Sequence, residues 1–295
     1  MNEPEFHCGF VAIVGRPNVG KSTLMNHLIG QKVSITSKKA QTTRHRVHGI
    51  HTEPTAQFIF VDTPGFQTFH RNALNDALNQ SVRDTLSSVD CVLFVLEAKR
   101  LTDADREVIA LLPKKVPVVL VVNKIDKAKD REELAAFIAD CRQEFAFTDV
   151  EVVSAKHGQR LAELLDKVRP HLPESPPLYP EDMITDKSER FLATEIVREK
   201  LFRYLGEELP YAMNVEIELW EMEGEMRRIH IAVLVEKDSQ KGILIGKGGE
   251  KLKKISTEAR LDMEKLFDGK VFLRVFAKVK SGWADDVRFL KEFGL

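Results

Sequence analysis

The clearest chemistry lies near the N-terminus, between an apolar run and a helical pattern. Residues 15–22 read G-R-P-N-V-G-K-S and follow the apolar residues 10–14, as in the phosphate-binding P-loop. The glycines let successive N–H groups point at an anion, and the following helix adds the positive end of its dipole. We expect Lys21 to reach the β- and γ-phosphates and Ser22 to ligate Mg²⁺. The expected phosphate-binding residues here are Gly15, Arg16, Pro17, Asn18, Val19, Gly20, Lys21, Ser22 and Thr23.

A second motif, D-T-P-G, directly follows the apolar run 57–61. A carboxylate at the end of a strand can hold Mg²⁺, and a glycine lets its N–H approach the γ-phosphate because no side chain is in the way. Alone, D-x-P-G is a common turn. Downstream of a P-loop it predicts four more phosphate-binding residues, with Asp62 also a metal ligand: Asp62, Thr63, Pro64 and Gly65.

A third motif, N-K-I-D, ends the apolar run 116–122 and indicates which base is bound. The Asp126 carboxylate can accept from both N1–H and the 2-amino group of guanine, whereas adenine lacks that amino group. Discrimination should be steep, because adenine would leave the carboxylate unpaired. The tripeptide S-A-K after residues 150–153 can place the Ala155 N–H at guanine O6 and the Lys156 stem over the base. The predicted guanine-binding residues are Asn123, Lys124, Asp126, Ser154, Ala155 and Lys156.

Strand-like runs alternate with helical patterns from residue 10 to about 169, which predicts a mostly parallel sheet covered on both faces. The second and third strands are joined by residues 53–55, too short for a crossover, so we expect an antiparallel hairpin. Ligands of such sheets bind beyond the carboxyl ends of the strands, where the three motifs fall. We expect strands at 10–14, 47–51, 57–61, 91–96, 116–122 and 150–153, and helices near 21–29, 72–87, 103–112, 131–145 and 161–169.

Taken together, these motifs resemble the translation-factor-type GTPases, over about residues 8–170. The resemblance implies a GTPase that converts GTP to GDP and phosphate with Mg²⁺. It also implies that a threonine of the loop 31–46 closes on Mg²⁺ and the γ-phosphate. Thr42 and Thr43 are both candidates, and we favour Thr43. The implied metal ligands are Ser22, Thr43 and Asp62, and the implied catalytic residues are Lys21, Thr43, Gly65 and Asn18.

One position departs from a common GTPase pattern. Glutamine often follows D-x-x-G and orients the attacking water, but Phe66 stands there in this chain. The sequence resembles the subgroup with an apolar residue at that place, in which backbone, a monovalent cation or a partner must hold the water. Asn18 is typical of its potassium-assisted members, which gives the hypothesis that Asn18 helps to seat K⁺. The alternative, an amide that stabilises the loop, stays open.

Length and charge indicate two folded units with different partners. The chain has 295 residues, 30% of them charged, and a formal net charge of −1. Residues 237–280 hold 12 Lys and Arg against 6 Asp and Glu, a net of +6, which points to a polyanion bound there. The three scattered cysteines predict reduced thiols, and we expect a cytoplasmic protein without a membrane span.

A proline-rich segment separates the two predicted domains. Five of the 12 prolines fall in residues 170–180, which predicts a stiff, extended linker. We expect a GTPase domain at 1–170, the linker at 171–187 and a second domain at 188–295.

The second domain contains the sequence I-G-K-G-G between two helical patterns. The order helix, strand, strand, short helix, G-x-x-G, helix, strand resembles an α+β type II KH domain. The resemblance implies that single-stranded RNA binds at this loop, with Leu252 and Ile255 also in the apolar groove floor. The implied RNA-binding residues are Ile243, Ile245, Gly246, Lys247, Gly248, Gly249, Lys251 and Lys254. A final helix is expected near 283–295.

A GTPase domain, a linker and one KH domain resemble a family of bacterial GTPases that act in small-ribosomal-subunit assembly. The resemblance implies recognition of single-stranded 16S rRNA near its 3′ end, gated by the GTP state. It further implies the small subunit as partner, a monomer, and peripheral contact with the inner membrane. Two alternatives stay open: a signalling GTPase whose second domain binds protein, and a GTP-dependent RNA-modifying enzyme.

Overall fold

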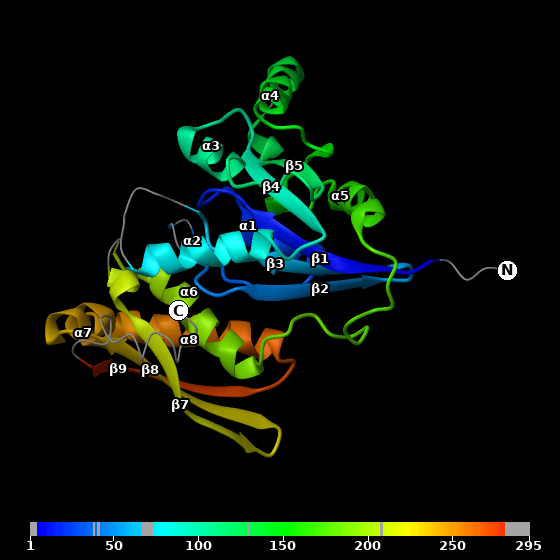
Figure 1. Cartoon of the computed structure of the whole chain (residues 1–295). Coiled ribbons are helices and arrows are strands. Elements are labelled where there is room, and N and C mark those ends of the chain that lie inside the picture. The colour runs from blue at the N-terminus through cyan, green and yellow to red at the C-terminus, as the bar shows by residue number, and fades with distance from the viewer. Residues whose placement is uncertain are drawn as a thin grey trace. The chain divides into compact units, whose positions relative to one another are not determined.

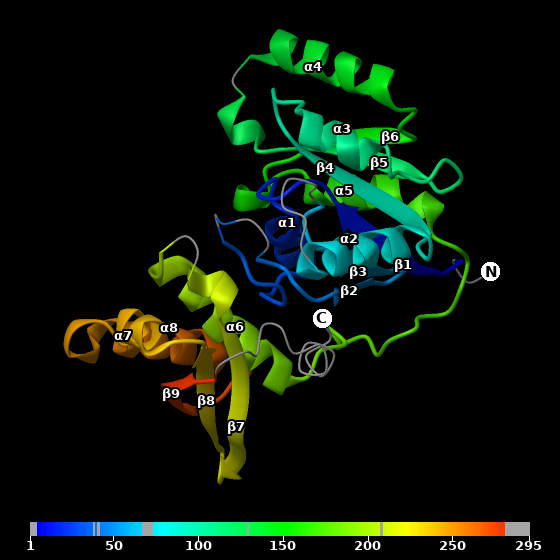
Figure 2. The ribbon, with the colours of Figure 1, turned by 60° about the vertical axis from the view of Figure 1, so that its left-hand side comes forward.

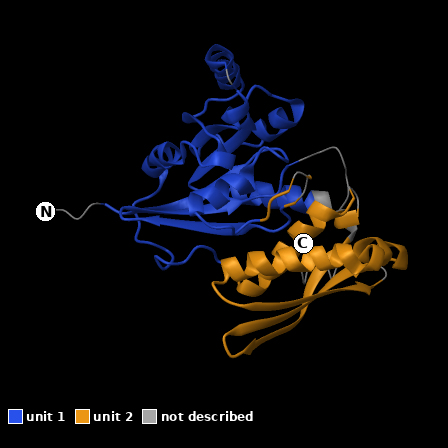
Figure 3. Cartoon of the chain, turned by 180° about the vertical axis from the view of Figure 1, so that it is seen from behind, with its two compact units in different colours: residues 1–34, 43–186 blue, residues 35–42, 187–295 orange. Residues whose placement is uncertain are grey.

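We describe the protein from a computed structural model. The structure describes residues 5–37, 39, 42–66, 73–128, 130–206 and 209–280. The chain divides into two compact units, one of residues 1–34 and 43–186 and one of residues 35–42 and 187–295 (Figure 3). The expected helix at 283–295 lies outside the described residues.

The first unit is built on a six-stranded sheet in the order β2-β3-β1-β4-β5-β6 (Figure 1). Every neighbouring pair is parallel except β2 and β3, which form the expected antiparallel hairpin. All six residues of Val118–Asn123 are buried, as a central strand covered on both faces requires. The strands are β1 (His7–Val14), β2 (Val47–Glu53), β3 (Ala56–Asp62), β4 (Cys91–Glu97), β5 (Val118–Asn123) and β6 (Asp149–Val152).

Five helices cover this sheet (Figures 1 and 2). Val82, Val108 and Cys141, from three of them, share one hydrophobic core with Phe94 and Leu120 of the sheet. The helices are α1 (Lys21–Ile29), α2 (Ala73–Leu86), α3 (Asp103–Ile109), α4 (Arg131–Glu144) and α5 (Leu161–Val168), and short 3-10 turns lie at η1 (Ile125–Lys127), η2 (Ala155–His157) and η3 (Arg169–His171).

Helix α1 packs closely on β2 at Gly49. A Cβ atom at this position would lie 2.0 Å from Ile29 Cδ1 and 3.1 Å from the Met25 sulfur. Since real Cβ contacts are longer than this, the helix can approach only a glycine. The close packing fixes α1, and with it the P-loop that precedes it.

The proline-rich segment is extended but packs along the first unit. Cys8 N–H donates to the Pro173 carbonyl at 3.0 Å, and Ile50 N–H donates to the Ile184 carbonyl at 2.9 Å. The fully buried Gln57 accepts the N–H groups of Leu178 and Tyr179, each at 2.9 Å. These bonds pair backbone groups of the segment with the first unit, so the segment is held against the sheet.

The second unit is a three-stranded sheet, in the order β7-β8-β9, with helices against it (Figures 1 and 2). Strands β7 and β8 are antiparallel and β8 and β9 are parallel, which matches the expected type II KH order. The elements are α6 (Glu189–Tyr204), η4 (Leu209–Ala212), β7 (Asn214–Glu223), β8 (Met226–Val235), α7 (Asp238–Ile245), η5 (Lys247–Gly249), α8 (Glu250–Leu266) and β9 (Val271–Val279).

Residues 35–42 group with the second unit although the flanking chain belongs to the first (Figure 3). Thr36 Oγ1 donates to Glu199 of α6 at 3.2 Å. Lys39 Nζ donates to the carbonyls of Leu205 and Gly206 at 2.7 and 2.9 Å. These carbonyls follow the end of α6, where the helix dipole favours a cation.

Candidate functional site

The P-loop curls between β1 and α1 through three residues with positive φ. Asn18 has φ 67° and Gly20 φ 106°; at Gly20 a Cβ would lie 2.4 Å from Asn123 Nδ2. Lys21 Nζ donates to the carbonyls of Gly15 and Arg16 at 3.0 and 3.1 Å. The Lys21 ammonium is therefore held inside the curl of the loop, which is where the phosphates of a bound nucleotide would lie.

Two buried charges face each other beneath this loop. Burial lowers the pKa of Lys21 to about 8, although the Asp62 charge opposes the shift. Burial also raises the pKa of Asp62, against the hydrogen bond from Ser34 and the charge of Lys21. A phosphate beside Lys21 would favour its protonated ammonium form. A cation beside Asp62 would likewise favour its charged carboxylate form.

Hard oxygen donors gather around Asp62. Its Oδ2 accepts hydrogen bonds from Ser22 Oγ and Ser34 Oγ, both at 2.7 Å, and from Thr43 Oγ1 at 3.3 Å. Its Oδ1 is buried without a hydrogen-bond partner. The unpaired carboxylate oxygen and the neighbouring hydroxyl oxygens are the kind of ligands that Mg²⁺ prefers. The residues therefore fit this ion.

The structure separates the two threonine candidates of the loop 31–46. Thr43 Oγ1 lies 3.1 Å from Ser22 Oγ, while Thr42 Oγ1 donates to the Lys39 carbonyl at 2.9 Å. Of the two, Thr43 joins the Ser22 and Asp62 cluster; its role as an Mg²⁺ ligand stays a prediction.

The D-T-P-G turn lies against the P-loop. At Gly65 a Cβ would come within 2.9 Å of the Pro17 backbone, so a side chain there would separate the two loops. Thr63 Oγ1 donates to the Ile13 carbonyl at 2.9 Å and so fixes the turn to β1. Phe66 is buried in the core, with the Arg83 guanidinium 5.8 Å from its ring centroid. Its ring fills the core and provides no hydrogen bond to a water.

Asn123 joins the three base- and phosphate-binding loops. Its Nδ2 donates to the Val19 carbonyl at 2.8 Å, and its Oδ1 accepts from Lys124 N at 2.7 Å and from Ala155 N at 2.9 Å. We expected the Ala155 N–H to donate to guanine O6, but here it donates to Asn123 Oδ1. A hydrogen bond to the base would require the N–H to be shared between the two acceptors. A buried amide with these partners holds the loops in one register.

Asp126 is held in its charged form by a neighbouring hydroxyl. Ser154 Oγ donates to its Oδ1 at 2.6 Å, and this hydrogen bond lowers the pKa of Asp126 despite some burial. The carboxylate is therefore charged at neutral pH. Lys156 follows in η2 and is exposed.

Some residues at this site were missed by reading motifs alone. Ser34 donates to Asp62, and Glu97 accepts from Lys124. The Arg16 side chain, expected to bind phosphate, pairs instead with Asp105 at 3.1 Å. One sequence feature could have identified Glu97: it is an acidic residue at the end of a strand, on the edge of the sheet where ligands bind.

The I-G-K-G-G loop of the second unit has backbone conformations that favour glycine, and it borders open space. Gly246, Gly248 and Gly249 all have positive φ, between 61° and 81°. Nothing lies within 4 Å of the Cβ positions of Gly248 and Gly249, and Lys247 is exposed. The Gly249 N–H is used within the loop, where it donates to the Gly246 carbonyl at 3.2 Å, so a phosphate would approach the loop from its open side, beside Lys247.

The apolar residues around this loop divide into two groups. Ile243 is 51% exposed and Ile245 is partly exposed, as a groove floor requires. Ile255, which we expected in the groove, is fully buried in the core, because that side of α8 packs on the sheet. Lys251 is partly exposed, and Lys254 Nζ lies 4.6 Å from the Tyr204 ring centroid.

The fold and the two sites define a P-loop GTPase that carries a C-terminal KH domain. The family described as 50S ribosome-binding GTPase matches residues 10–124. The KH domain family matches residues 208–284. The predicted fold class is therefore confirmed. Among the described residues, no helix is both long and apolar enough to cross a membrane.

Comparison over the whole chain is more specific. GTPase Era of Chromobacterium violaceum is 80% identical over 295 residues, which is 100% of both chains. GTPase Era of Neisseria meningitidis serogroup A is 74% identical over 98% of this chain and 95% of its own. This chain belongs to the Era family of GTPases, which confirms the resemblance seen in the motifs.

Two solved structures agree with this assignment over both units. A point variant of Aquifex aeolicus Era bound to GDP and AlF₄⁻ has a TM-score of 0.93, 37% identity and coverage of 98% of this chain and 99% of its own. Era in complex with MgGDPNP and nucleotides 1506–1542 of 16S ribosomal RNA has a TM-score of 0.92 at the same identity and coverage. Both solved structures thus match this chain along nearly its whole length.

Proposed function

We propose that this GTPase is a molecular switch that binds single-stranded 16S rRNA near its 3′ end and assists maturation of the small ribosomal subunit. The observation that carries the proposal is a guanine site of interlocked loops in the same chain as an exposed G-K-G-G loop. A similar protein, 37% identical, binds MgGDPNP and a 16S rRNA fragment. Both ligand classes match the chemistry of the two sites.

At the nucleotide site, the P-loop N–H groups and Lys21 bind the β- and γ-phosphates. Ser22, Thr43 and Asp62 would hold Mg²⁺, which when bound neutralises charge that develops on the phosphates. Gly65 donates its N–H to the γ-phosphate, and Asp126 accepts from guanine. Because Phe66 provides no hydrogen bond, the attacking water must be held by backbone, by a monovalent cation or by a partner.

Asn18 is the residue that we assign to K⁺. Its side chain is exposed at the P-loop, while its carbonyl accepts from Lys124 Nζ at 2.8 Å. Hydrolysis should be faster in K⁺ than in Na⁺ buffer, and Asn18→Gly should remove the difference, since glycine keeps the left-handed backbone without the amide. Equal wild-type rates in the two buffers would refute the assignment.

GTP state and RNA binding are linked, in this proposal, through the loop that ends at Thr43. When γ-phosphate and Mg²⁺ hold Thr43, they restrain the chain of residues 35–42, which groups with the KH unit through Thr36 and Lys39. The nucleotide thereby shifts the population of RNA-binding states, and hydrolysis resets it. The expected inner-membrane contact and monomeric state stay predictions.

The test is to crosslink the protein in cells and sequence the RNA recovered with it. We expect reads concentrated at the 3′ end of 16S rRNA, lost when Lys247 and Gly248 are both changed to Asp. Reads spread evenly over cellular RNA would refute the proposal. RNA recovery unchanged by the double substitution would favour the signalling alternative.

A further inference from the structure

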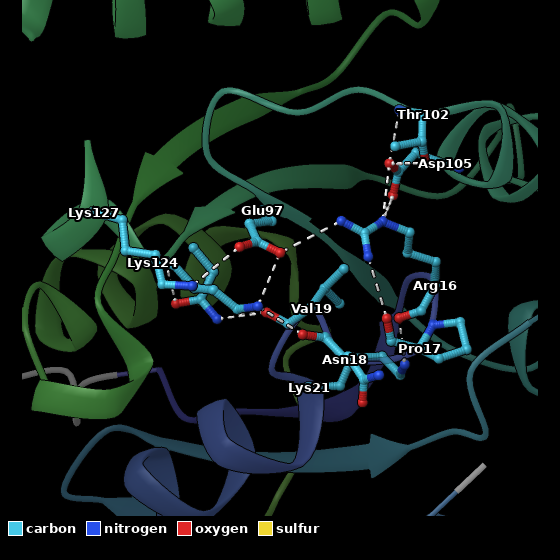
Figure 4. Close-up of polar contacts among 11 residues, drawn as sticks. Arg16, Pro17, Asn18, Val19, Lys21, Glu97, Thr102, Asp105, Lys124 and Lys127 are labelled. Carbon is cyan, nitrogen blue, oxygen red and sulfur yellow. Dashed lines mark hydrogen bonds and ion pairs between the residues drawn. The ribbon is translucent and has the colours of Figure 1, made fainter. Parts of the chain in front are cut away.

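Glu97, the last residue of β4, lies between the phosphate-binding and base-binding loops. Its Oε2 accepts from Lys124 Nζ at 2.9 Å and lies 3.5 Å from the Arg16 guanidinium, and its Oε1 accepts from Lys127 Nζ at 3.3 Å. Figure 4 shows the carboxylate with the two lysines on one side and the arginine on the other. One acid thus meets three cations from two loops.

On the base-binding side, the Lys124 ammonium has two partners. It donates to Glu97 and also to the Asn18 carbonyl of the P-loop at 2.8 Å. Lys124 itself holds a left-handed backbone conformation, φ 65°, which is unfavourable for a residue with a Cβ. Without Glu97, the ammonium would keep only one of its two partners among these contacts, and the strained loop would be held less firmly.

On the phosphate side, the Arg16 guanidinium is held by a second, fully buried acid. Asp105 is 0% exposed and accepts from Arg16 Nε at 3.1 Å. The same carboxylate accepts from Thr102 N and Thr102 Oγ1 at 2.9 and 2.7 Å, in the capping box of α3. Asp105 therefore fixes Arg16 from one side, and Glu97 meets it from the other.

The electrostatics of Glu97 match a bridging role. Burial alone would raise its pKa, but hydrogen bonds and charge from Lys124 and Lys127 lower it below the usual value. The side chain is 21% exposed, so its interactions are partly screened and modest in strength. Glu97 is not among the residues that face the expected phosphate, metal or guanine positions.

We propose that Glu97 is a positioning residue that ties Lys124 to Arg16 and so preorganises the base-binding and phosphate-binding loops as one rigid site. The inference rests on the nucleotide site assigned above. Its loss should weaken binding of GDP and GTP about tenfold, a factor equal to about 1.4 kcal/mol. Hydrolysis at saturating GTP should stay within about twofold, because the groups at the γ-phosphate are untouched.

The experiment compares Glu97→Gln, which keeps side-chain volume, with Glu53→Gln as a matched control. Glu53 also ends a strand of the same unit, is 26% exposed against 21%, and pairs with Arg169. Fluorescent GDP titrations give the Kd, and steady-state hydrolysis gives KM and kcat. We expect Glu97→Gln to raise Kd and KM together, Glu97→Asp to recover most of the affinity by keeping the charge, and Glu53→Gln to match the wild type.

A double-mutant cycle with Lys124→Met separates positioning from a general structural role. If Glu97 acts through Lys124, Glu97→Gln should add less than about twofold in that background. A fully additive loss, or a wild-type Kd for Glu97→Gln, would overturn the inference. Failure of wild-type protein to bind GDP would instead overturn the nucleotide site itself.

Discussion

The nucleotide site and the RNA loop of this Era-family GTPase are built in opposite ways. At the nucleotide site, Asn123 is buried and hydrogen-bonded to groups of several loops, and Asp62 is buried with hydroxyl donors gathered at its Oδ2. At the RNA loop, Gly248 and Gly249 face open space beside an exposed lysine. The comparison indicates that the base-binding loops are preorganised by the protein, whereas the proposed RNA-binding loop offers open space and positive charge, for which RNA phosphates would be the partners.

The largest effect is expected where the preorganised site meets its ligand. Asp126→Asn should weaken GDP binding by about 10²- to 10³-fold, because the amide cannot accept from both guanine donors and one polar group stays unpaired. Binding of xanthosine diphosphate should rise, since its O2 can accept from the new amide. Titrations with both nucleotides test this, and an unchanged GDP affinity would break the comparison.

A smaller effect is expected at the open loop. Lys247→Asp with Gly248→Asp should weaken binding of a single-stranded 16S 3′-end oligonucleotide by about 10- to 100-fold, because it reverses the charge and adds a Cβ at φ 61°. GDP affinity should not change. Lys265→Asp, at the far end of α8 and also exposed, is the control and should lower RNA affinity much less. Equal losses for the double variant and for Lys265→Asp would mean that only overall charge matters.

The smallest effect concerns a buried polar group remote from both ligands. Gln57→Leu should lower the free energy of unfolding by about 1–3 kcal/mol, because the N–H groups of Leu178 and Tyr179 lose their acceptor. Urea unfolding measures this. Gln80→Leu, at an exposed glutamine of α2 that pairs with Asp84, should change stability by less than about 0.5 kcal/mol. A stable Gln57→Leu protein would show that the proline-rich segment is not held by these bonds.

Local patterns were sufficient to predict the sheet and the motif positions. The turn at residues 53–55 predicted the β2–β3 hairpin, and each motif lies at the strand end where it was expected. These features depend on residues close in sequence, such as the glycines and Lys21 of the P-loop. Periodicity and turn chemistry therefore carried that information.

Contacts between distant residues could not be predicted in the same way. Arg16 meets Asp105 across 89 positions, and Ser34 meets Asp62 across 28. Nothing local marks these partners, because the pairing depends on how the loops and helices pack. Ile255 shows the same limit: its apolar side chain suits a groove or a core equally, and only the packing of α8 places it in the core.

The central claim is that the nucleotide state gates RNA binding, and one measurement tests it most directly. The affinity of wild-type protein for the 16S 3′-end oligonucleotide should be compared with GDP bound and with a non-hydrolysable GTP analogue bound, at one salt and Mg²⁺ concentration. We predict tighter binding with the analogue, by at least about fivefold. Equal affinity in the two states would contradict it.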